Sequence, residues 1–295
     1  MLQSRFITYL KNEKRRSGHT IRSYASDIAA FSAYAATQYG ITNLTEITHE
    51  MLRSWMVTLL DSGMKITSVK RKISALRSLY KYGIKIGLTD KNPTESIYTP
   101  VQPKRLPVFY QVDEMLLFFG QPESPDDFTE VRNRLVMELL YTTGMRCAEL
   151  TALKDTAVNS ERREIKVTGK RNKERIIPVS DRIISHIKQY QKLRNEHIVP
   201  LNNKGFLIVS SKGNAAYPKM IYRIVHTLLS QVTTRDKRSP HKIRHTFATH
   251  MLNAGADLNT IKELLGHSSL EATQVYTHNS IDQLKSIYKQ AHPKA

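Results

Sequence analysis

The chain has 295 residues, of which 45 are lysine or arginine and 26 are aspartate or glutamate, so its formal net charge is +19 at pH 7. Residues 1–100 carry 15 basic and 7 acidic side chains and residues 101–295 carry 30 and 19, which excludes a separate basic tail and favours a polyanionic partner such as nucleic acid. A single cysteine excludes a disulfide within the chain and a cysteine-based zinc site, so we expect a cytoplasmic protein.

The first hundred residues predict a domain of short amphipathic helices. Apolar side chains recur there at spacings of three and four, as in the stripe Ile21, Tyr24, Ile28 and Phe31. Thr48 is placed to cap a third helix that ends near Gly63, and the fourth helix ends at Gly83 or Gly87. This fourth helix carries Lys70, Arg71 and Lys72. Such charges are typical either of a solvated helix face or of a surface that contacts DNA phosphates, and both interpretations stay open.

Residues 99–107 predict a linker. Four prolines, at 93, 100, 103 and 107, accompany Lys104 and Arg105 without a helical or alternating apolar pattern. The chain is also long enough for two domains, which we place at 1–98 and 108–295. The longest strongly apolar runs fall far short of the roughly 20 residues that span a bilayer, so we expect no membrane partner.

The second domain opens with a predicted helix start at Ser124-Pro125-Asp126-Asp127, which combines a cap, a proline and acidic residues. The two aspartates also fit a metal-dependent nuclease, but capping needs no further ligand, and we predict no metal there. Residues 154–180 alternate as strands around a turn at Gly169, with Pro178 typical of an edge strand. Short helices follow at 241–254 and 258–265, closed by glycines.

Several polar residues in this domain are poorly explained as surface. Arg146 lies in a largely uncharged segment, where it suits either an anionic partner or an ion pair with Glu149. His241 and Arg244 fall one helical turn apart, so a proton-exchanging group and a fixed cation share one face. His241 and His245 have the spacing of zinc ligands, but a glutamate base and a third ligand are missing from the motif, and we expect no metal.

Five segments, in this order, resemble the tyrosine recombinase family, and most closely its bacterial Xer branch: Thr-Gly-Met-Arg-Cys-Ala-Glu-Leu at 143–150, Val-Thr-Gly-Lys-Arg-Asn-Lys-Glu-Arg at 167–175, His-Lys-Ile-Arg-His-Thr-Phe-Ala-Thr-His at 241–250, Leu-Leu-Gly-His-Ser-Ser at 264–269 and Val-Tyr-Thr-His at 275–278. The likeness covers nearly the whole chain. The resemblance implies that Arg146 and Arg244 bind the oxygens of a DNA phosphate and that His267 adds a further hydrogen-bond donor to it. It also implies that Glu149 holds these residues in place without contacting the phosphate itself.

The same resemblance makes Tyr276 the nucleophile that becomes esterified to the 3′ phosphate. A phenol of pKa near 10 is a poor nucleophile at neutral pH, so His241 is implied to assist proton transfer and Lys170 to protonate the departing 5′ oxygen. Lys173 and Arg175 on the same hairpin are expected to contact phosphates, although assignment of the acid to Lys173 stays open. Because the ester bond energy is retained and no phosphate-binding loop is present, we predict no cofactor.

The resemblance implies a mainly α fold with a small antiparallel β-sheet, arranged as a C-shaped, two-domain clamp on double-stranded DNA. Recombination takes four strand cleavages, which implies a homo- or heterotetramer with a related recombinase, and a septal DNA translocase is a further implied partner. Residues 279–292 predict an amphipathic helix that packs on its own domain or docks on a neighbouring protomer. Chromosome dimer resolution is the expected role. An integrase or invertase of a mobile element, and a catalytically silent DNA-binding protein, remain as alternatives.

Overall fold

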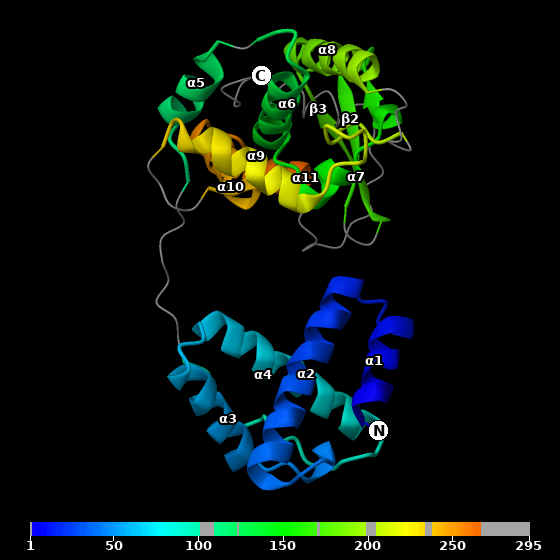
Figure 1. The fold of residues 1–295 in the computed structure, drawn as a ribbon, viewed down its shortest axis with the longest axis vertical. Coiled ribbons are helices and arrows are strands. Elements are labelled where there is room, and N and C mark those ends of the chain that lie inside the picture. Colours follow the sequence, from blue (N-terminus) through cyan, green and yellow to red (C-terminus); the bar gives the residue numbers. More distant parts are fainter. Residues whose placement is uncertain are drawn as a thin grey trace. The chain divides into compact units, whose positions relative to one another are not determined.

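The computed structural model describes residues 2–100, 109–122, 124–169, 172–198, 205–233 and 238–266. The chain divides into two compact units, Met1–Leu106 and Pro107–Ala295, each with its own apolar core. Blue and cyan ribbons mark the first unit in Figure 1, and green to orange ribbons mark the second. Most of the predicted linker lies outside the described residues. No described helix combines the length and the apolar character needed to cross a membrane.

The described part of the N-terminal unit contains four α-helices and one 3₁₀ turn: α1 (Leu2–Asn12), α2 (Gly18–Tyr39), η1 (Leu44–Glu46), α3 (His49–Asp61) and α4 (Ile66–Lys85). The predicted cap is confirmed, because the Thr48 side chain accepts from the Met51 backbone N–H at the start of α3. Phe31 of α2 and Trp55 of α3 lie 5.0 Å apart between ring centroids in the core. Of the two predicted ends of the fourth helix, the later one is correct: α4 continues through Gly83, and Gly87 takes a left-handed conformation after it.

The C-terminal unit surrounds the long buried helix α6. Its helices are α5 (Val112–Gly120), α6 (Phe128–Thr143), α7 (Cys147–Ala152), η2 (Asp155–Ala157), α8 (Asp181–His197), α9 (Pro218–Ser230), α10 (Pro240–Asn253) and α11 (Leu258–Leu265). Helix α6 packs against α7, α8, α9 and α10, and Figure 1 shows α8 and α9 on different sides of it. Thirteen of its residues are buried, from Phe128 to Thr143, so it forms the centre of this unit.

A three-stranded antiparallel sheet completes this unit, in the order β1 (Val158–Asn159), β2 (Glu164–Thr168) and β3 (Glu174–Pro178). Ile165 of β2 lies opposite Ile177 of β3, with both side chains in the core. Pro178 lies on the edge strand β3, as predicted. Because β3 pairs with β2 on one side alone in this sheet, the missing N–H of proline costs no hydrogen bond to a second neighbouring strand. The predicted fold class, mainly α with a small antiparallel sheet, is therefore confirmed.

Helix α6 begins later than the sequence pattern predicts. Residues Ser124 to Asp127 form a turn closed by a hydrogen bond from the Asp127 N–H to the Ser124 carbonyl, 3.2 Å long. The cap is Asp127, whose carboxylate accepts from the Glu130 N–H at 2.8 Å. The serine and proline thus lie before the helix rather than in its first turn. The capping explanation of Asp127 holds, with the helix starting at Phe128 instead of directly after Ser124.

Candidate active site

Arg146 and Glu149 open helix α7 as a reciprocal pair. The Glu149 carboxylate accepts from the Arg146 backbone N–H at 2.7 Å and from its guanidinium at 2.8 Å. The alternative of an ion pair is therefore present in the structure. The two partners differ in exposure, however: 41% of the Arg146 side chain is exposed, against 4% for Glu149. One end of the Arg146 guanidinium is fixed by this pair, and the side chain still reaches solvent.

Arg175 of β3 is the second cation on Glu149. Its two terminal nitrogens donate to the two carboxylate oxygens at 3.1 and 2.8 Å, and its Nε donates to the Leu264 carbonyl at 2.7 Å. Only 5% of the side chain is exposed. In this conformation the donors of Arg175 face protein acceptors in the interior, which argues against the predicted contact with a DNA phosphate.

Arg244 of α10 is the third cation of the group and is buried. Its terminal nitrogens donate to the carbonyls of Gly144 and Leu265, each at 2.6 Å. Burial, together with the smaller effect of the nearby charge of Arg146, lowers the pKa of Arg244 to about 10, while Glu149 opposes the shift. An arginine at pH 7 is still charged at that value. The fold therefore holds a cation here at an electrostatic cost.

The group formed by Arg146, Arg175, Arg244 and Glu149, which we name the arginine cluster, has three positive charges and one negative charge, a net +2. Buried cations without a matching anion are costly, and guanidinium groups bind phosphate oxygens through charge-assisted hydrogen bonds. Arg146 and Arg244, the predicted clamp residues, thus lie within electrostatic reach of each other. The cluster can bind one anionic group at the exposed side of Arg146.

Gly144 explains how α6, α10 and α11 approach closely enough to form the cluster. It ends α6 with a left-handed φ of +58°. A Cβ atom there would lie 2.5 Å from Cδ1 of Phe247 and 2.8 Å from Cδ2 of Leu265, closer than real contacts allow. Only glycine combines this conformation with this approach. The Gly144 carbonyl that results is the one that Arg244 binds.

Two more glycines, Gly169 and Gly266, lie against residues of the arginine cluster. Gly169, at the end of β2, would place a Cβ 3.3 Å from Oε1 of Glu149, and its N–H donates to the Lys173 carbonyl across the hairpin at 2.7 Å. Gly266, which caps α11 with φ +64°, would place a Cβ 3.3 Å from Arg175. In the sequence these glycines directly precede Lys170 and His267. Lys170, His267 and Tyr276 themselves lie outside the described residues.

His241 lies in the first turn of α10 and is exposed, one turn before buried Arg244, while Ile243 points into the core. The predicted helical spacing of His241 and Arg244 is confirmed, because both lie in α10. Burial lowers the pKa of neighbouring His245, and the charges of Lys242 and His241 lower it further. No group of three potential ligands that could hold a metal ion occurs in the part of the chain that the structure describes.

Cys147, beside Arg146, is half-buried, and burial raises the pKa of its thiol. A raised pKa keeps the sulfur protonated and therefore poorly nucleophilic at neutral pH. The side chain packs against the core of the C-terminal unit. These observations favour packing over a chemical role for this cysteine.

The basic residues of α4 differ from one another. The Lys72 side chain is 12% exposed, pairs with Asp27 at 3.3 Å and lies over the Trp55 ring at 5.7 Å. Arg71, 45% exposed, donates to Asp27 and to Ser23. Lys70 is half-buried and makes neither of these contacts. In this conformation the Lys72 ammonium is held against α2 and Trp55, which argues against the predicted contact with DNA. Lys173 is exposed beside the hairpin turn.

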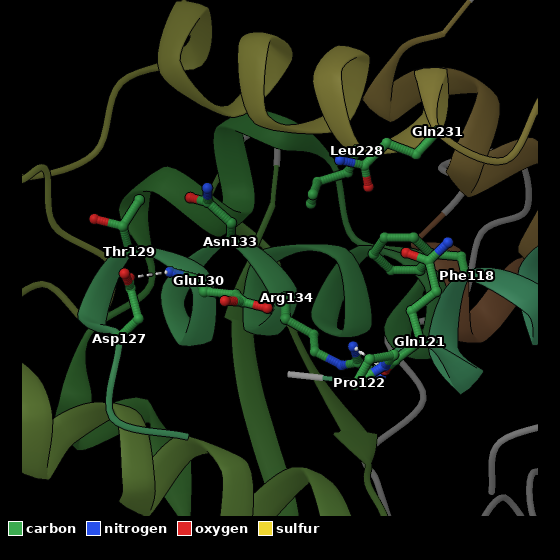
Figure 2. Close-up of a pocket in the computed structure, with 10 residues that line it drawn as sticks. All are labelled: Phe118, Gln121, Pro122, Asp127, Thr129, Glu130, Asn133, Arg134, Leu228 and Gln231. Carbon is green, nitrogen blue, oxygen red and sulfur yellow. Dashed lines mark hydrogen bonds between the residues drawn. The ribbon is translucent and has the colours of Figure 1, made fainter. Parts of the chain in front are cut away.

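A hollow of about 280 Å³ lies between the start of α6 and the end of α9, and Figure 2 shows its lining side chains. Two of its charged groups are used for structure: Asp127 caps α6, and Arg134 donates to the Gln121 carbonyl at 2.9 Å. Phe118 and Leu228 supply apolar walls. The hollow contains none of the residues predicted to carry the chemistry.

Sequence reasoning missed the buried group that fixes Tyr110, the second described residue after the linker. Its carbonyl lies 2.8 Å from His250 Nε2, and its N–H donates to the Thr246 hydroxyl at 3.0 Å. His250 Nδ1 lies 2.9 Å from the hydroxyl of Tyr141, and burial lowers the pKa of His250. A neutral ring satisfies both contacts, with Nε2 donating and Nδ1 accepting. Thr246 and His250 stand in the 241–250 motif, which was the available signal.

Comparisons with known proteins identify the family of this chain. Residues 110–282 match the phage integrase family, and residues 4–87 match the phage integrase N-terminal SAM-like domain. The chain belongs to the tyrosine recombinase family. It is 36% identical over 291 residues to tyrosine recombinase XerC of Pelobacter propionicus, covering 98% of this chain and 94% of that one. It is also 36% identical to tyrosine recombinase XerC of Staphylococcus aureus, covering 100% and 97%.

Solved structures give the same result. XerH site-specific recombinase bound to its difH substrate matches with a TM-score of 0.68 and 25% identity, covering 97% of this chain and 84% of that one. The Tn1549 transposon integrase in complex with circular-intermediate DNA matches with a TM-score of 0.72 at 15% identity, covering 96% and 99%, which supports the fold alone. This tyrosine recombinase is accordingly a site-specific DNA recombinase.

Proposed function

We propose that this recombinase cleaves and rejoins duplex DNA through a covalent bond between Tyr276 and a 3′ phosphate, and that it resolves chromosome dimers. The observation that carries the first part is the net +2 charge of the arginine cluster. Such a cluster is suited to the charge that builds on the non-bridging oxygens of a phosphate under attack. Arg146 and Arg244 bind those oxygens in this proposal.

The remaining roles follow from the chemistry of the exchange. The phenolic oxygen of Tyr276 attacks phosphorus, its proton passes to a base such as His241, and the bond to the 5′ oxygen breaks. That oxygen takes a proton from Lys170, and His267 donates a hydrogen bond to the phosphate. Because one phosphate ester replaces another, the reverse reaction rejoins a strand without a nucleotide cofactor. The backbone that leads into Lys170 and His267 adjoins the cluster at Gly169 and Gly266.

The partners belong to the same proposal. Double-stranded DNA is the substrate, with a homo- or heterotetramer acting on two sites and a septal DNA translocase as a further partner. Support comes from neighbours solved as a dimer on a core site and a tetramer on a Holliday junction, both lambda integrase. Two relatives that match over nearly their whole length carry the name XerC, which favours the chromosomal role over that of a mobile-element integrase.

Mapping the covalent adduct on DNA from cells tests the proposal. DNA is extracted under denaturing conditions from cells that express the full chain, and protein-linked 3′ ends are sequenced. We expect adducts at one recurring chromosomal site, and none with Tyr276→Phe. Tyr98→Phe, at a tyrosine that is 88% exposed, is the matched control and should retain them.

Three results would contradict the proposal in different places. Adducts that persist in Tyr276→Phe would remove this residue as the nucleophile. Adducts confined to the ends of a mobile element would replace the chromosomal role with that of an integrase or invertase. DNA occupancy without any adduct would mark a catalytically silent DNA-binding protein.

A further inference from the structure

Arg175 uses three of its nitrogens to join segments that are far apart in the sequence. Its terminal nitrogens bind both carboxylate oxygens of Glu149 at the start of α7, and its Nε binds the Leu264 carbonyl near the end of α11. The residues are separated by 26 positions on one side and 89 on the other. A planar guanidinium has the fixed fork needed for such a set, whereas a lysine ammonium is a point charge without it.

Two glycines lie against the ion pair. A Cβ on Gly266 would lie 3.3 Å from Cδ and Nη1 of Arg175, and one on Gly169 would lie 3.3 Å from Oε1 of Glu149 and 3.7 Å from Nη1 of Arg175. The next residues in the sequence are His267 and Lys170. A single side chain, Arg175, therefore lies against the backbone that leads into Lys170, the predicted acid, and into His267, the predicted phosphate donor.

Arg175 also decides how much charge Arg146 keeps for DNA. Glu149 is almost fully buried, and a buried carboxylate needs a cation. Were Arg146 the sole partner, its charge would be cancelled by Glu149. With Arg175 bound bidentately to the same carboxylate, the cluster retains a net +2. Arg146, the more exposed of the two, can then act on an external anion.

We infer that Arg175 is a positioning residue of the strand exchange: it touches no DNA, and it holds Glu149, the β2–β3 turn and the end of α11 in one arrangement. The inference rests on the proposed function, because the groups it positions are those assigned to the phosphate and to the leaving oxygen. It replaces the sequence-based expectation of a phosphate contact. It also predicts a defect in chemistry, separate from defects in folding or DNA affinity.

The test compares Arg175→Lys with the wild-type chain on nicked duplexes that carry the site mapped from cells. One duplex has the ordinary scissile phosphate, and the other has sulfur in place of the bridging 5′ oxygen. A thiol has a pKa near 8.5 and leaves without an acid, so a misplaced general acid matters less on the second duplex. We expect cleavage of the ordinary duplex to slow about 10- to 100-fold, the range for outer-shell partners, with most of the loss recovered on the sulfur duplex and DNA affinity unchanged.

Arg182→Lys is the matched control, since it makes the same change at a 58% exposed arginine of α8 that pairs with Glu138 of α6. It should cleave both duplexes like the wild type. Thermal unfolding shows whether Arg175→Lys is folded. If it is unfolded, Glu149→Gln takes its place, because it keeps a side-chain oxygen for Arg175 while removing the charge, and the same preference for the sulfur duplex is expected.

Three outcomes would overturn the inference. If Arg175→Lys cleaves like the wild type, the forked guanidinium is not needed. Equal losses of cleavage on the two duplexes would show a general structural role. A loss confined to DNA affinity would support the sequence-based prediction that Arg175 contacts a DNA phosphate. Failure of the proposed function looks different. In that case the wild-type chain itself forms no adduct on the sulfur duplex, or Tyr276→Phe forms one as well.

Discussion

Each unit of this recombinase contains a buried carboxylate that accepts from two cations, and the two sites use the cations differently. In the N-terminal unit, Asp27 binds Arg71 and Lys72, and Lys72 is also pressed against an indole ring. In the C-terminal unit, Glu149 binds Arg146 and Arg175, and a third cation, Arg244, lies in the same field. The first site fixes one helix against another, whereas the second leaves two positive charges in excess.

The difference shows that charge in the sequence does not measure the charge available for DNA. Lys72 belongs to a basic run, and its ammonium is nevertheless fixed between Asp27 and Trp55. Arg244 is buried, donates to two backbone carbonyls, and remains a cation that no carboxylate binds directly among the described residues. A buried carboxylate removes cations from the surface, and a buried cation held by carbonyls keeps its charge for a ligand. The predictions below test each half of this comparison.

The largest effect is expected at the cluster. Arg244→Ala removes one of the two cations assigned to the phosphate, and loss of one such donor costs about 100- to 1,000-fold in rate. DNA affinity should change little, because most of the binding energy comes from many phosphate contacts elsewhere. Single-turnover cleavage of a nicked duplex carrying the mapped site, together with its equilibrium binding, measures both quantities.

Arg238→Ala serves as a comparison for Arg244→Ala, since Arg238 donates to the Thr233 carbonyl and lies outside the cluster. It should cleave at the wild-type rate. If Arg244→Ala loses DNA affinity but cleaves normally, the comparison between the two units fails. The excess positive charge of the C-terminal unit would then contribute to DNA binding and not to cleavage.

Gly144→Ala should have the next largest effect, and it acts on folding. A left-handed alanine costs about 1–2 kcal/mol and the clash with Phe247 and Leu265 adds to it, for a loss of about 2–3 kcal/mol. Gly40→Ala in the N-terminal unit has a similar φ of +68° with no atom within 4 Å of the added Cβ, so it isolates the conformational cost. Denaturant unfolding measures both. Equal losses would mean that the close approach at Gly144 can relax.

A pH series separates the charge on Glu149 from its packing. Burial raises the pKa of Glu149, but hydrogen bonds from Arg175 and Arg146 outweigh it and hold the pKa below its ordinary 4.5. The ionised form is therefore favoured by folding, and its contribution is present above pH 4.5 and is lost as the pH falls through the folded-state value. The wild-type chain should unfold at a higher temperature than Glu149→Gln at pH 7, and the gap should close below pH 4.5. A constant gap would contradict the charge assignment.

Local signals in the sequence were sufficient for much of the fold. Helix periodicity placed Phe31 in the core of its unit, Thr48 marked a helix start, and Pro178 marked an edge strand. These features depend on neighbours within a few residues. The start of α6 was placed too early because Ser124 and Asp127 are both good caps, and the choice depends on packing.

The site could be predicted only in part, for a physical reason. Motif spacing identified Arg146, Arg244 and Glu149, which the structure brings together. It could not reveal that Arg175 faces inward or that Lys72 is fixed by Asp27, because each depends on a partner 26 or 45 residues away. Basic residues on a helix or hairpin look alike in sequence, and a single buried carboxylate decides which of them are exposed to DNA.

The smallest expected effect tests that conclusion within one helix. Lys70→Ala and Lys72→Ala make the same change two positions apart on α4. We expect Lys70→Ala to reduce the slope of log affinity against log salt by about 1 and to leave stability unchanged. Lys72→Ala should leave the slope unchanged and cost about 1 kcal/mol, because it removes the partner of Asp27 and the cation over Trp55. Binding of a duplex at several salt concentrations, with denaturant unfolding, measures both. If the two slopes fall equally, the Lys72 ammonium leaves Asp27 for a phosphate when DNA binds. The N-terminal unit would then also offer to DNA a cation that is paired with a buried carboxylate in the free protein.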